Sequence, residues 1–272
     1  MNYRLYKRAW IYNDSPHTEQ HLTSAECDKM LKIGGVIIRN LFDFDTNETE
    51  FWYVIKDRFE GINETPSKHR GRLRKAIERF DCKMVDKEYI LQHGYQVYVR
   101  AAEKYRVKYT PPTEEEFRAR INLCDSRYDL WACIDKETGK LAAFAINHVF
   151  ADCVDYQTMK FDPEVMSKLH CSYGLIYEMN RYYLEELKMK YVSDGARSLT
   201  NHSDVQPFLI EKFKFRKAYC RMVITYKWWF GLLVKAAFPF RNYIPSLSVR
   251  SILKMEEINR TFKNNDKTIQ ML

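Results

Sequence analysis

The chain lacks the apolar runs that identify membrane-spanning and secreted proteins. Its 272 residues contain no uninterrupted apolar run of about 18, the length at which a helix can cross a bilayer. Charged residues interrupt the apolar ones throughout Met1–Trp10, so we expect no secretory signal peptide. These absences predict a cytoplasmic protein.

The motifs of several common enzyme classes are also missing. The seven cysteines are scattered, with no C-x-x-C and no Cys/His pair at zinc spacing, which is typical of a reducing compartment and predicts no metal site. A phosphate-binding loop, a dinucleotide fingerprint, an H-E-x-x-H motif and a serine nucleophile elbow are all absent. The sequence therefore does not match the motifs of the common nucleotide-binding, metalloprotease and serine hydrolase classes.

The composition that remains is that of a folded, basic protein. Hydrophobic residues make up 46% of the chain and aromatic residues 15%, which is enough for a packed core. The formal net charge is +8, and the isoelectric point is about 9.0. This charge favours encounter with anionic partners such as phosphorylated cofactors, nucleic acid or acidic membrane.

Two prolines mark the main expected boundary. The segment TPPT at residues 110–113 ends any helix and stiffens the connection. We predict a β-rich and helical half at 1–109, a second domain at 110–226, and an apolar helix with a basic tail at 227–272. Within the first half, the β-rich runs Gly35–Asp45 and Thr49–Lys56 are expected to form a hairpin.

The order of elements between residues 152 and 226 is the most informative feature. A strand-like run, Cys153–Phe161, leads into one long amphipathic helix, and a short strand follows that ends at Asp194-Gly195. A second helix, the segment FLIEKFKFRKAY and a Tyr-rich strand complete the series. This order resembles the acyl-binding half of the GNAT N-acyltransferase superfamily, and most of all the branch with the Fem-type aminoacyltransferases. The resemblance implies an α/β fold, with a GNAT-like mixed sheet flanked by helices and a shortened, related N-terminal half.

The resemblance also implies where an acyl donor binds. In that superfamily two neighbouring strands splay apart beside the donor, and the next helix receives its pyrophosphate. Here Cys153–Phe161 and Tyr191–Asp194 would splay. The usual glycine-rich loop is replaced by KLHCSYG, and the Fem-type branch, which uses aminoacyl-tRNA, lacks that loop too, so acyl-CoA and aminoacyl-tRNA both stay open as donors. The expected donor-binding residues are Met159, Lys160, Phe161, Lys168, Ser172 and Gly174.

A basic helix is the second point of resemblance. The segment SKHRGRLRKA is similar to the R-x-x-I-R-K-A helix of Fem-type enzymes. One helical turn separates Arg70 from Arg74, and another separates Lys68 from Arg72, so two basic ridges could clamp a phosphate or polyanion. We therefore expect Lys68, Arg70, Arg74 and Lys75 to bind an anionic substrate. The alternative is an ordinary solvated helix surface.

A polar stretch after the second strand is the expected catalytic region. GNAT chemistry needs a base for the amine and an acid for the leaving group. His202 is the expected base, Asp194 could orient it, and Tyr219 could serve as the acid. Alternatively, this stretch is an exposed loop and Asp194-Gly195 a simple turn. Arg197, Ser198 and Asn201 are the expected substrate-binding residues.

The apolar segment Trp228–Phe240 leaves two readings open. It could be a helix packed on the sheet, or a helix in a membrane interface, with Trp228 and Trp229 at headgroup level. In the second case Lys227, Lys235 and Arg241 would attract anionic lipid, and the protein would be peripheral to the inner face of the membrane. A homodimer is also left open.

The predicted function is transfer of an acyl or aminoacyl group, from acyl-CoA or aminoacyl-tRNA, to an amine acceptor by direct attack. The alternative is a non-catalytic GNAT-like module that binds an anionic ligand or a membrane surface.

Overall fold

The computed structural model describes residues 2–103, 110–197 and 205–269, with side chains described as far as Thr261. The chain forms two compact units that are not continuous in sequence. One comprises Met1–Tyr53, Ala196–Asn201 and Lys217–Leu272, and the other Val54–Gly195 and His202–Arg216. The domain boundaries that the sequence predicts after residues 109 and 226 remain predictions.

The first unit is built on a four-stranded sheet in the order β1-β2-β3-β11. Its strands β1 and β2 are antiparallel, β2 and β3 are parallel, and β3 and β11 are antiparallel. Helix α1 begins at a capping box formed by Thr23 and Glu26 and packs Met30 and Leu31 against Ile38. The elements are β1 (Tyr3–Tyr6), β2 (Ala9–Tyr12), α1 (Ser24–Ile33), β3 (Ile37–Phe42), β11 (Arg221–Tyr226), α8 (Trp228–Ala237), the 3₁₀ turn η3 (Phe238–Phe240) and α9 (Leu247–Ile269).

The expected hairpin between residues 35–45 and 49–56 is wrong. The neighbours of β3 are β2 and β11, so both of its edges are already paired. Strand β4 (Trp52–Lys56) lies in the other sheet, next to β9 and β10. Positive φ angles at Asp43 and Asp45 turn the chain between the two strands. The distant strand β11 thus takes the edge that the local hairpin would have used.

The expected basic tail is instead the helix α9. Its buried side chains Leu253 and Ile258 supply the apolar surface that a helix needs for docking, and α9 packs on β11. The amide oxygen of Asn259 accepts a hydrogen bond from the backbone N–H of Ile224 at 3.2 Å. The Tyr226 hydroxyl donates to Glu256 at 2.9 Å.

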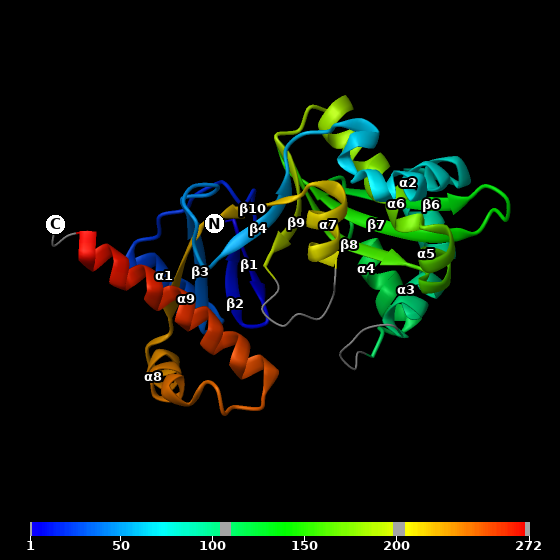
Figure 1. The fold of residues 1–272 in the computed structure, drawn as a ribbon. Helices are drawn as coiled ribbons and strands as arrows, with labels where there is room; N and C mark the ends of the chain where they lie inside the picture. The colour runs from blue at the N-terminus through cyan, green and yellow to red at the C-terminus, as the bar shows by residue number, and fades with distance from the viewer. Residues whose placement is uncertain (1, 104–109, 198–204, 270–272) are drawn as a thin grey trace. The chain divides into compact units, whose positions relative to one another are not determined.

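The second unit contains most of a seven-stranded mixed sheet in the order β10-β4-β9-β8-β7-β6-β5 (Figure 1). Strands β5 to β8 are antiparallel, whereas β8 and β9 are parallel. This is the predicted mixed sheet flanked by helices. The elements are η1 (Gly61–Glu64), α2 (Ser67–Arg79), β5 (Phe80–Met84), α3 (Lys87–Glu103), α4 (Glu114–Asn122), β6 (Tyr128–Asp135), β7 (Leu141–Val149), β8 (Cys153–Phe161), α5 (Pro163–Leu169), α6 (Cys171–Asn180), the π-helix η2 (Arg181–Glu186), β9 (Tyr191–Ala196), α7 (Val205–Phe213) and β10 (Arg216–Tyr219).

Helices cover both faces of this sheet. On one face Leu130 and Phe144 pack in a core with Phe117 of α4 and the buried side of α3. On the other face Trp131 donates its indole N–H to the Tyr183 hydroxyl at 2.8 Å, and Cys133 lies against α6. Successive side chains of β6 point to opposite faces of the sheet, so each face packs against its own layer of helices.

The single long helix expected after β8 is three segments, α5, α6 and η2. The break falls at His170, whose φ of +62° is left-handed and ends α5. At this point the chain turns, so that α6 can bury Cys171, Leu175 and Ile176. The apolar periodicity on either side of His170 looks continuous in sequence, and for that reason the break was not predicted.

Gly94 on α3 provides a test of this packing. A Cβ added there would lie 2.9 Å from Phe117 Cζ and 3.0 Å from Ile90 Cγ2, both in the core. We expect Gly94→Ala to lower the free energy of unfolding by about 1–2 kcal/mol, because overpacking outweighs the gain in helix propensity. The matched control is Gly71→Ala on α2, where no atom lies within 4 Å, and it should stabilise by about 0.5–1 kcal/mol. Urea unfolding followed by circular dichroism measures both, and an unchanged midpoint for Gly94→Ala would contradict this account of the core.

Candidate functional site

The two parallel strands β8 and β9 diverge, as predicted. They pair at three positions, Cys153 with Tyr191, Val154 with Val192 and Asp155 with Ser193. Beyond Asp155, β8 continues to Phe161 in register with β7 alone. The expected donor-binding residues Met159, Lys160 and Phe161 lie on this diverging part of β8.

Two aspartates lie where the strands separate. Asp155 is in the last pair of the parallel ladder, and Asp194 directly follows its partner Ser193. Burial raises the pKa of Asp194 well above its ordinary value, and the neighbouring Asp155 carboxylate raises it further, while Gln206 opposes the change. The side-chain amide of Gln206 also donates to the Asp194 carbonyl at 3.3 Å. A carboxyl group with a raised pKa is suited to accept a proton near neutral pH.

A buried ion pair lies close to these strands. Lys56 Nζ is 2.8 Å from Glu64 Oε1, and both side chains are almost fully excluded from solvent. Burial raises the pKa of Glu64 to about 7, whereas Lys56 and the nearby Asn180 amide lower it. Asn180 in turn accepts a hydrogen bond from the Tyr156 hydroxyl at 2.9 Å.

Tyr156 links this ion pair electrostatically to the aspartates. Burial raises the pKa of Tyr156 well above 10, and the charges on Tyr183, Glu64 and Asp194 add to the effect. Glu64 and Asp194 are thus within electrostatic reach of one phenol on β8. Together these groups form a polar region at the divergence of the strands, buried around Glu64 and Tyr156 and partly exposed at the two aspartates, and able to hold or move a proton.

The loop after β8 does not fit the backbone cradle that coenzyme A would require. The Asp162 carboxylate accepts hydrogen bonds from the N–H groups of Glu164 at 3.0 Å and Val165 at 3.3 Å, and it pairs with Arg100 at 2.7 Å. The first turn of α5 therefore already has an anionic partner.

Ser172 and Gly174 on α6 are buried. A Cβ on Gly174 would lie 3.4 Å from Cys82 Sγ and 3.5 Å from the Ala76 carbonyl, so this glycine lets α6 approach α2. The placement of these two residues gives no support to their predicted donor-binding roles.

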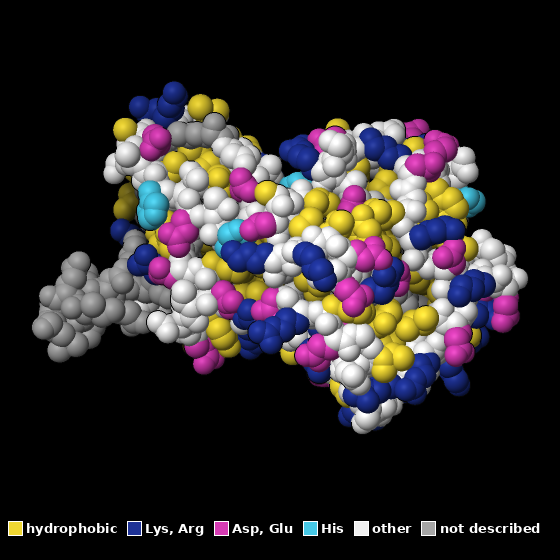
Figure 2. All heavy atoms as spheres, turned by 90° about the horizontal axis from the view of Figure 1, so that it is seen from above, with side chains coloured by type: hydrophobic (Ala, Val, Ile, Leu, Met, Phe, Trp, Pro, Cys, Tyr) yellow, Lys and Arg dark blue, Asp and Glu magenta, His cyan; other side chains and the backbone are white. Residues whose placement is uncertain are grey.

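A cationic pocket brings together two residues that were predicted separately. Lys75 of α2 and Lys168 of α5 line one cavity of about 410 Å³. Both side chains are exposed, and Lys168 pairs with Glu164 at 2.7 Å. Where α2 and α6 face the viewer in Figure 2, cationic and acidic side chains are interspersed. The remaining lining residues are Glu78, Arg79, Glu137, Leu169 and His170.

Two of these lining residues limit what the pocket can bind. Arg79 forms two ion-paired contacts of 2.8 Å with Asp135 and also pairs with Glu137, so its charge is largely satisfied. Burial lowers the pKa of His170, and the charges on Arg72 and Lys75 lower it further, so this imidazole is neutral near pH 7. The cations that face solvent here are thus the two lysines, which could contact a phosphate through their side chains.

The other predicted anion-binding residues of α2 differ in their surroundings. Lys68 and Arg74 are exposed. Arg70 is half-buried and donates from Nε to the Thr65 carbonyl at 3.1 Å. The clamp predicted for Arg70 and Arg74 stays a prediction.

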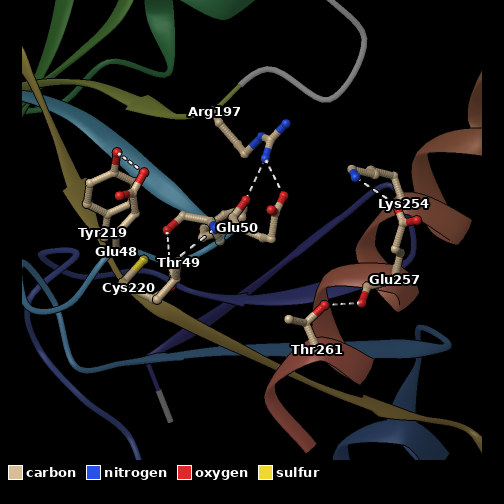
Figure 3. Close-up of polar contacts among 10 residues, drawn as sticks. Glu48, Thr49, Glu50, Arg197, Tyr219, Cys220, Lys254, Glu257 and Thr261 are labelled. Carbon is tan, nitrogen blue, oxygen red and sulfur yellow. Dashed lines mark hydrogen bonds and ion pairs between the residues drawn. The ribbon is translucent and has the colours of Figure 1, made fainter. Parts of the chain in front are cut away.

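The predicted acid–base group of Asp194, His202 and Tyr219 stays a prediction, because its members lie in different units or outside the described residues. Tyr219 belongs to the first unit, where its hydroxyl donates to Glu48 at 3.1 Å (Figure 3). Arg197, also in that unit, lies 3.6 Å from the Glu50 carboxylate and stacks 4.1 Å above the Trp52 ring. Asp194 belongs to the second unit. Ser198, Asn201 and His202 lie outside the described residues.

Of the residues in this polar region, only Asp194 was predicted from the sequence. Asp155 did carry a signal, because an acidic residue inside the strand run CVDYQTMKF is unusual. Lys56 and Glu64 carried none, since nothing in their spacing indicates that they meet. Their pairing depends on the path of the chain from β4 through η1.

Glu64 should make stability depend on pH in a defined window. Its folded pKa of about 7 lies above the ordinary 4.5, so its stabilising contribution is complete below about pH 4.5 and is lost as the pH rises toward 7. We expect the wild-type free energy of unfolding to fall by on the order of 3 kcal/mol across this window from this group. Glu64→Gln should remove that part of the slope, whereas exposed Glu185→Gln should keep it. Urea unfolding at acidic and neutral pH measures the slopes, and parallel curves for wild type and Glu64→Gln would contradict the assignment.

Known structures share this fold, although two comparisons of the sequence found no match. No protein-family model matches the chain, and no curated protein sequence matches it. A crystal structure of FemX is similar over 74% of this chain and 68% of its own length, with 11% identity and a TM-score of 0.51. The structure of L-PGS from Bacillus licheniformis is similar over 94% of this chain and 85% of its own length, with 11% identity and a TM-score of 0.50. The chain therefore shares the α/β fold of these two proteins, and a fold of this kind was predicted from the order of its elements.

Proposed function

We propose that the protein is an N-acyltransferase that moves an aminoacyl or acyl group to an amine by direct attack within a ternary complex. The observation that carries this proposal is the divergence of β8 from β9 directly after Asp155. A planar, amide-bearing donor could lie along the diverging part of β8, with its reacting carbonyl near Asp155 and Asp194. The likeness to FemX and L-PGS supports the fold on which the proposal rests.

The donor that we favour is an aminoacyl group on a polyanionic carrier, as in aminoacyl-tRNA. The α5 turn is capped by Asp162, and Gly174 is packed against α2, so the backbone cradle for a pyrophosphate is lacking. Lys68, Arg74 and Lys75 on α2 instead present cations on flexible side chains. Such side chains suit the repeated phosphates of a nucleic acid better than one tightly bound pyrophosphate. Acyl-CoA is the second donor to test.

Asp194 is the proposed proton acceptor. An alkyl amine is protonated near neutral pH, with an ordinary pKa of about 10, and must lose a proton before it can attack. In the proposed step the new C–N bond forms as the C–O bond of an ester donor, or the C–S bond of a thioester, breaks. The Asp194 carboxylate takes one proton from the ammonium form, which frees the nitrogen lone pair for attack. The N–H proton that the nitrogen loses as the amide forms passes to the leaving oxygen or sulfur. Burial, and after it the neighbouring Asp155 carboxylate, raises the pKa of Asp194 above its ordinary value, which makes its carboxylate a stronger base.

The alternative function is anion binding without catalysis. The observation that favours it is the pocket with Lys75 and Lys168, which would bind a phosphate whether or not transfer occurs. The two functions differ in one measurable product. A catalyst joins the labelled acyl group to an amine, whereas a binding module only retains the carrier.

Asp194→Asn tests the proton acceptor. With a pool of radiolabelled aminoacyl-tRNAs, or with acetyl-CoA, and a panel of amines, we expect kcat to fall about 10²–10⁴-fold while KM for the donor stays unchanged. Because the pKa of Asp194 is raised, wild-type activity should rise with pH as its carboxylate forms, and the variant should lose this limb. Asp125→Asn, at an exposed aspartate paired with Arg127, is the matched control and should behave as wild type.

The competing base is His202, which lies outside the described residues. If His202→Ala removes the pH limb and Asp194→Asn does not, the role proposed for Asp194 is wrong. If neither donor yields any amide product with wild-type protein, the transferase proposal itself fails and anion binding stands.

Lys75→Gln with Lys168→Gln tests the carrier site. We expect binding of total tRNA to weaken, and the slope of log K against log salt to become less negative by about 1 for each phosphate that the variant no longer neutralises. The control replaces two exposed lysines elsewhere, Lys140 and Lys188, and preserves the net charge change. Filter binding across a salt series measures the slopes. Equal slopes for the two double variants would show that the pocket does not contact the carrier.

A further inference from the structure

Helix α8 presents an apolar face to solvent. Trp228 is 76% exposed, Trp229 39%, and Leu232 and Leu233 58% each. Their spacing places them along one side of the helix, whereas Gly231 and Val234 are buried on the other. Packing within the first unit therefore uses only half of an apolar helix. We call the exposed half the α8 face.

The same kind of surface continues after the helix. Phe240 is 62% exposed, Tyr243 85% and Leu247, at the start of α9, 49%. Large apolar side chains that are exposed singly are common, but a contiguous set usually marks an interaction surface. The α8 face and these three residues belong to one compact unit and follow one another in sequence.

The charged residues along this segment of the sequence are all positive. The sequence from Lys212 to Lys254 contains no aspartate or glutamate. Lys227, Lys235, Arg241 and Arg250 lie within or beside the apolar segment, and in the described part of the chain only Arg241 of these four has an ion pair, with Glu257 at 3.4 Å. Binding of a protein partner does not require charges that are all positive, whereas an anionic lipid surface attracts each lysine and arginine.

The dimensions suit a helix that lies in the plane of a membrane. α8 has 10 residues and is therefore about 15 Å long, half the thickness of the hydrocarbon core. Among the described residues no helix is long and apolar enough to cross a membrane. Tryptophan and tyrosine prefer the headgroup level, where the ring is partly apolar and the N–H or O–H can still bond to water.

We propose that the α8 face, with Phe240 and Tyr243, binds the interface of an anionic lipid bilayer and makes the protein a peripheral membrane protein. This would place the acyltransferase proposed above at a membrane surface, but the proposal rests on α8 alone. It therefore stands or falls independently of the chemistry.

Co-sedimentation with phosphatidylcholine vesicles, with and without phosphatidylglycerol, tests the proposal. Wild-type protein should bind the vesicles that contain phosphatidylglycerol and bind pure phosphatidylcholine much more weakly. Leu232→Ser with Leu233→Ser should weaken binding about tenfold for each leucine, because each loses the burial of its exposed part. Lys227→Gln with Lys235→Gln should weaken binding about fivefold per lysine and reduce its salt dependence.

The matched control places the same Leu/Ile→Ser change at Ile33 and Leu123, which are 73% and 78% exposed and lie outside the α8 face. It should bind as wild type, and melting temperatures should confirm that every variant is folded. Wild-type protein that ignores anionic vesicles would overturn the proposal. So would a wild-type dimer that Leu232→Ser with Leu233→Ser converts to monomer in light scattering, because the α8 face would then be covered by a second copy of the chain.

Discussion

The parallel ladder between β8 and β9 is the constraint on which the rest of the candidate site depends. It holds the two strands together for three residue pairs and then ends, so β8 continues beside β7 alone. The pairing fixes Asp155 against Ser193 and thereby sets Asp194 next to it. The divergence after it separates the strands where a donor is proposed to lie. A longer ladder would fill that space.

Burial then determines the chemistry of the groups near that point. Glu64 and Tyr156 are removed from water and Asp194 is partly so, and in each the largest cause of the raised pKa is loss of solvation. Lys56 stabilises the charged form of Glu64 only in part, which leaves its pKa near neutrality. Groups of this kind cost stability when they are charged, so their presence in a cluster is more easily explained by a role in proton transfer than by a contribution to the fold.

The cationic and apolar surfaces belong to different compact units. Lys75 and Lys168 line a pocket of the second unit, whereas the α8 face belongs to the first. The first suits discrete phosphates, because flexible ammonium groups can follow them. The second suits a continuous anionic interface, because aromatic and aliphatic side chains occur there without acidic neighbours. The excess positive charge of the chain thus has at least two separate uses in these proposals.

The sequence alone determined the features that depend on neighbours along the chain. The strand-like run Cys153–Phe161 predicted β8, with the same bounds as the structure. The order of elements was enough to predict the fold and the splayed strands. Only the tertiary structure decided what depends on distant neighbours. It paired β3 with the distant strand β11 instead of β4, although β4 is the nearer strand in sequence. It also brought Lys56 to Glu64 and Lys75 to Lys168, and it left the α8 face exposed. Each of these depends on which surfaces meet when the elements pack, and no local periodicity contains that information.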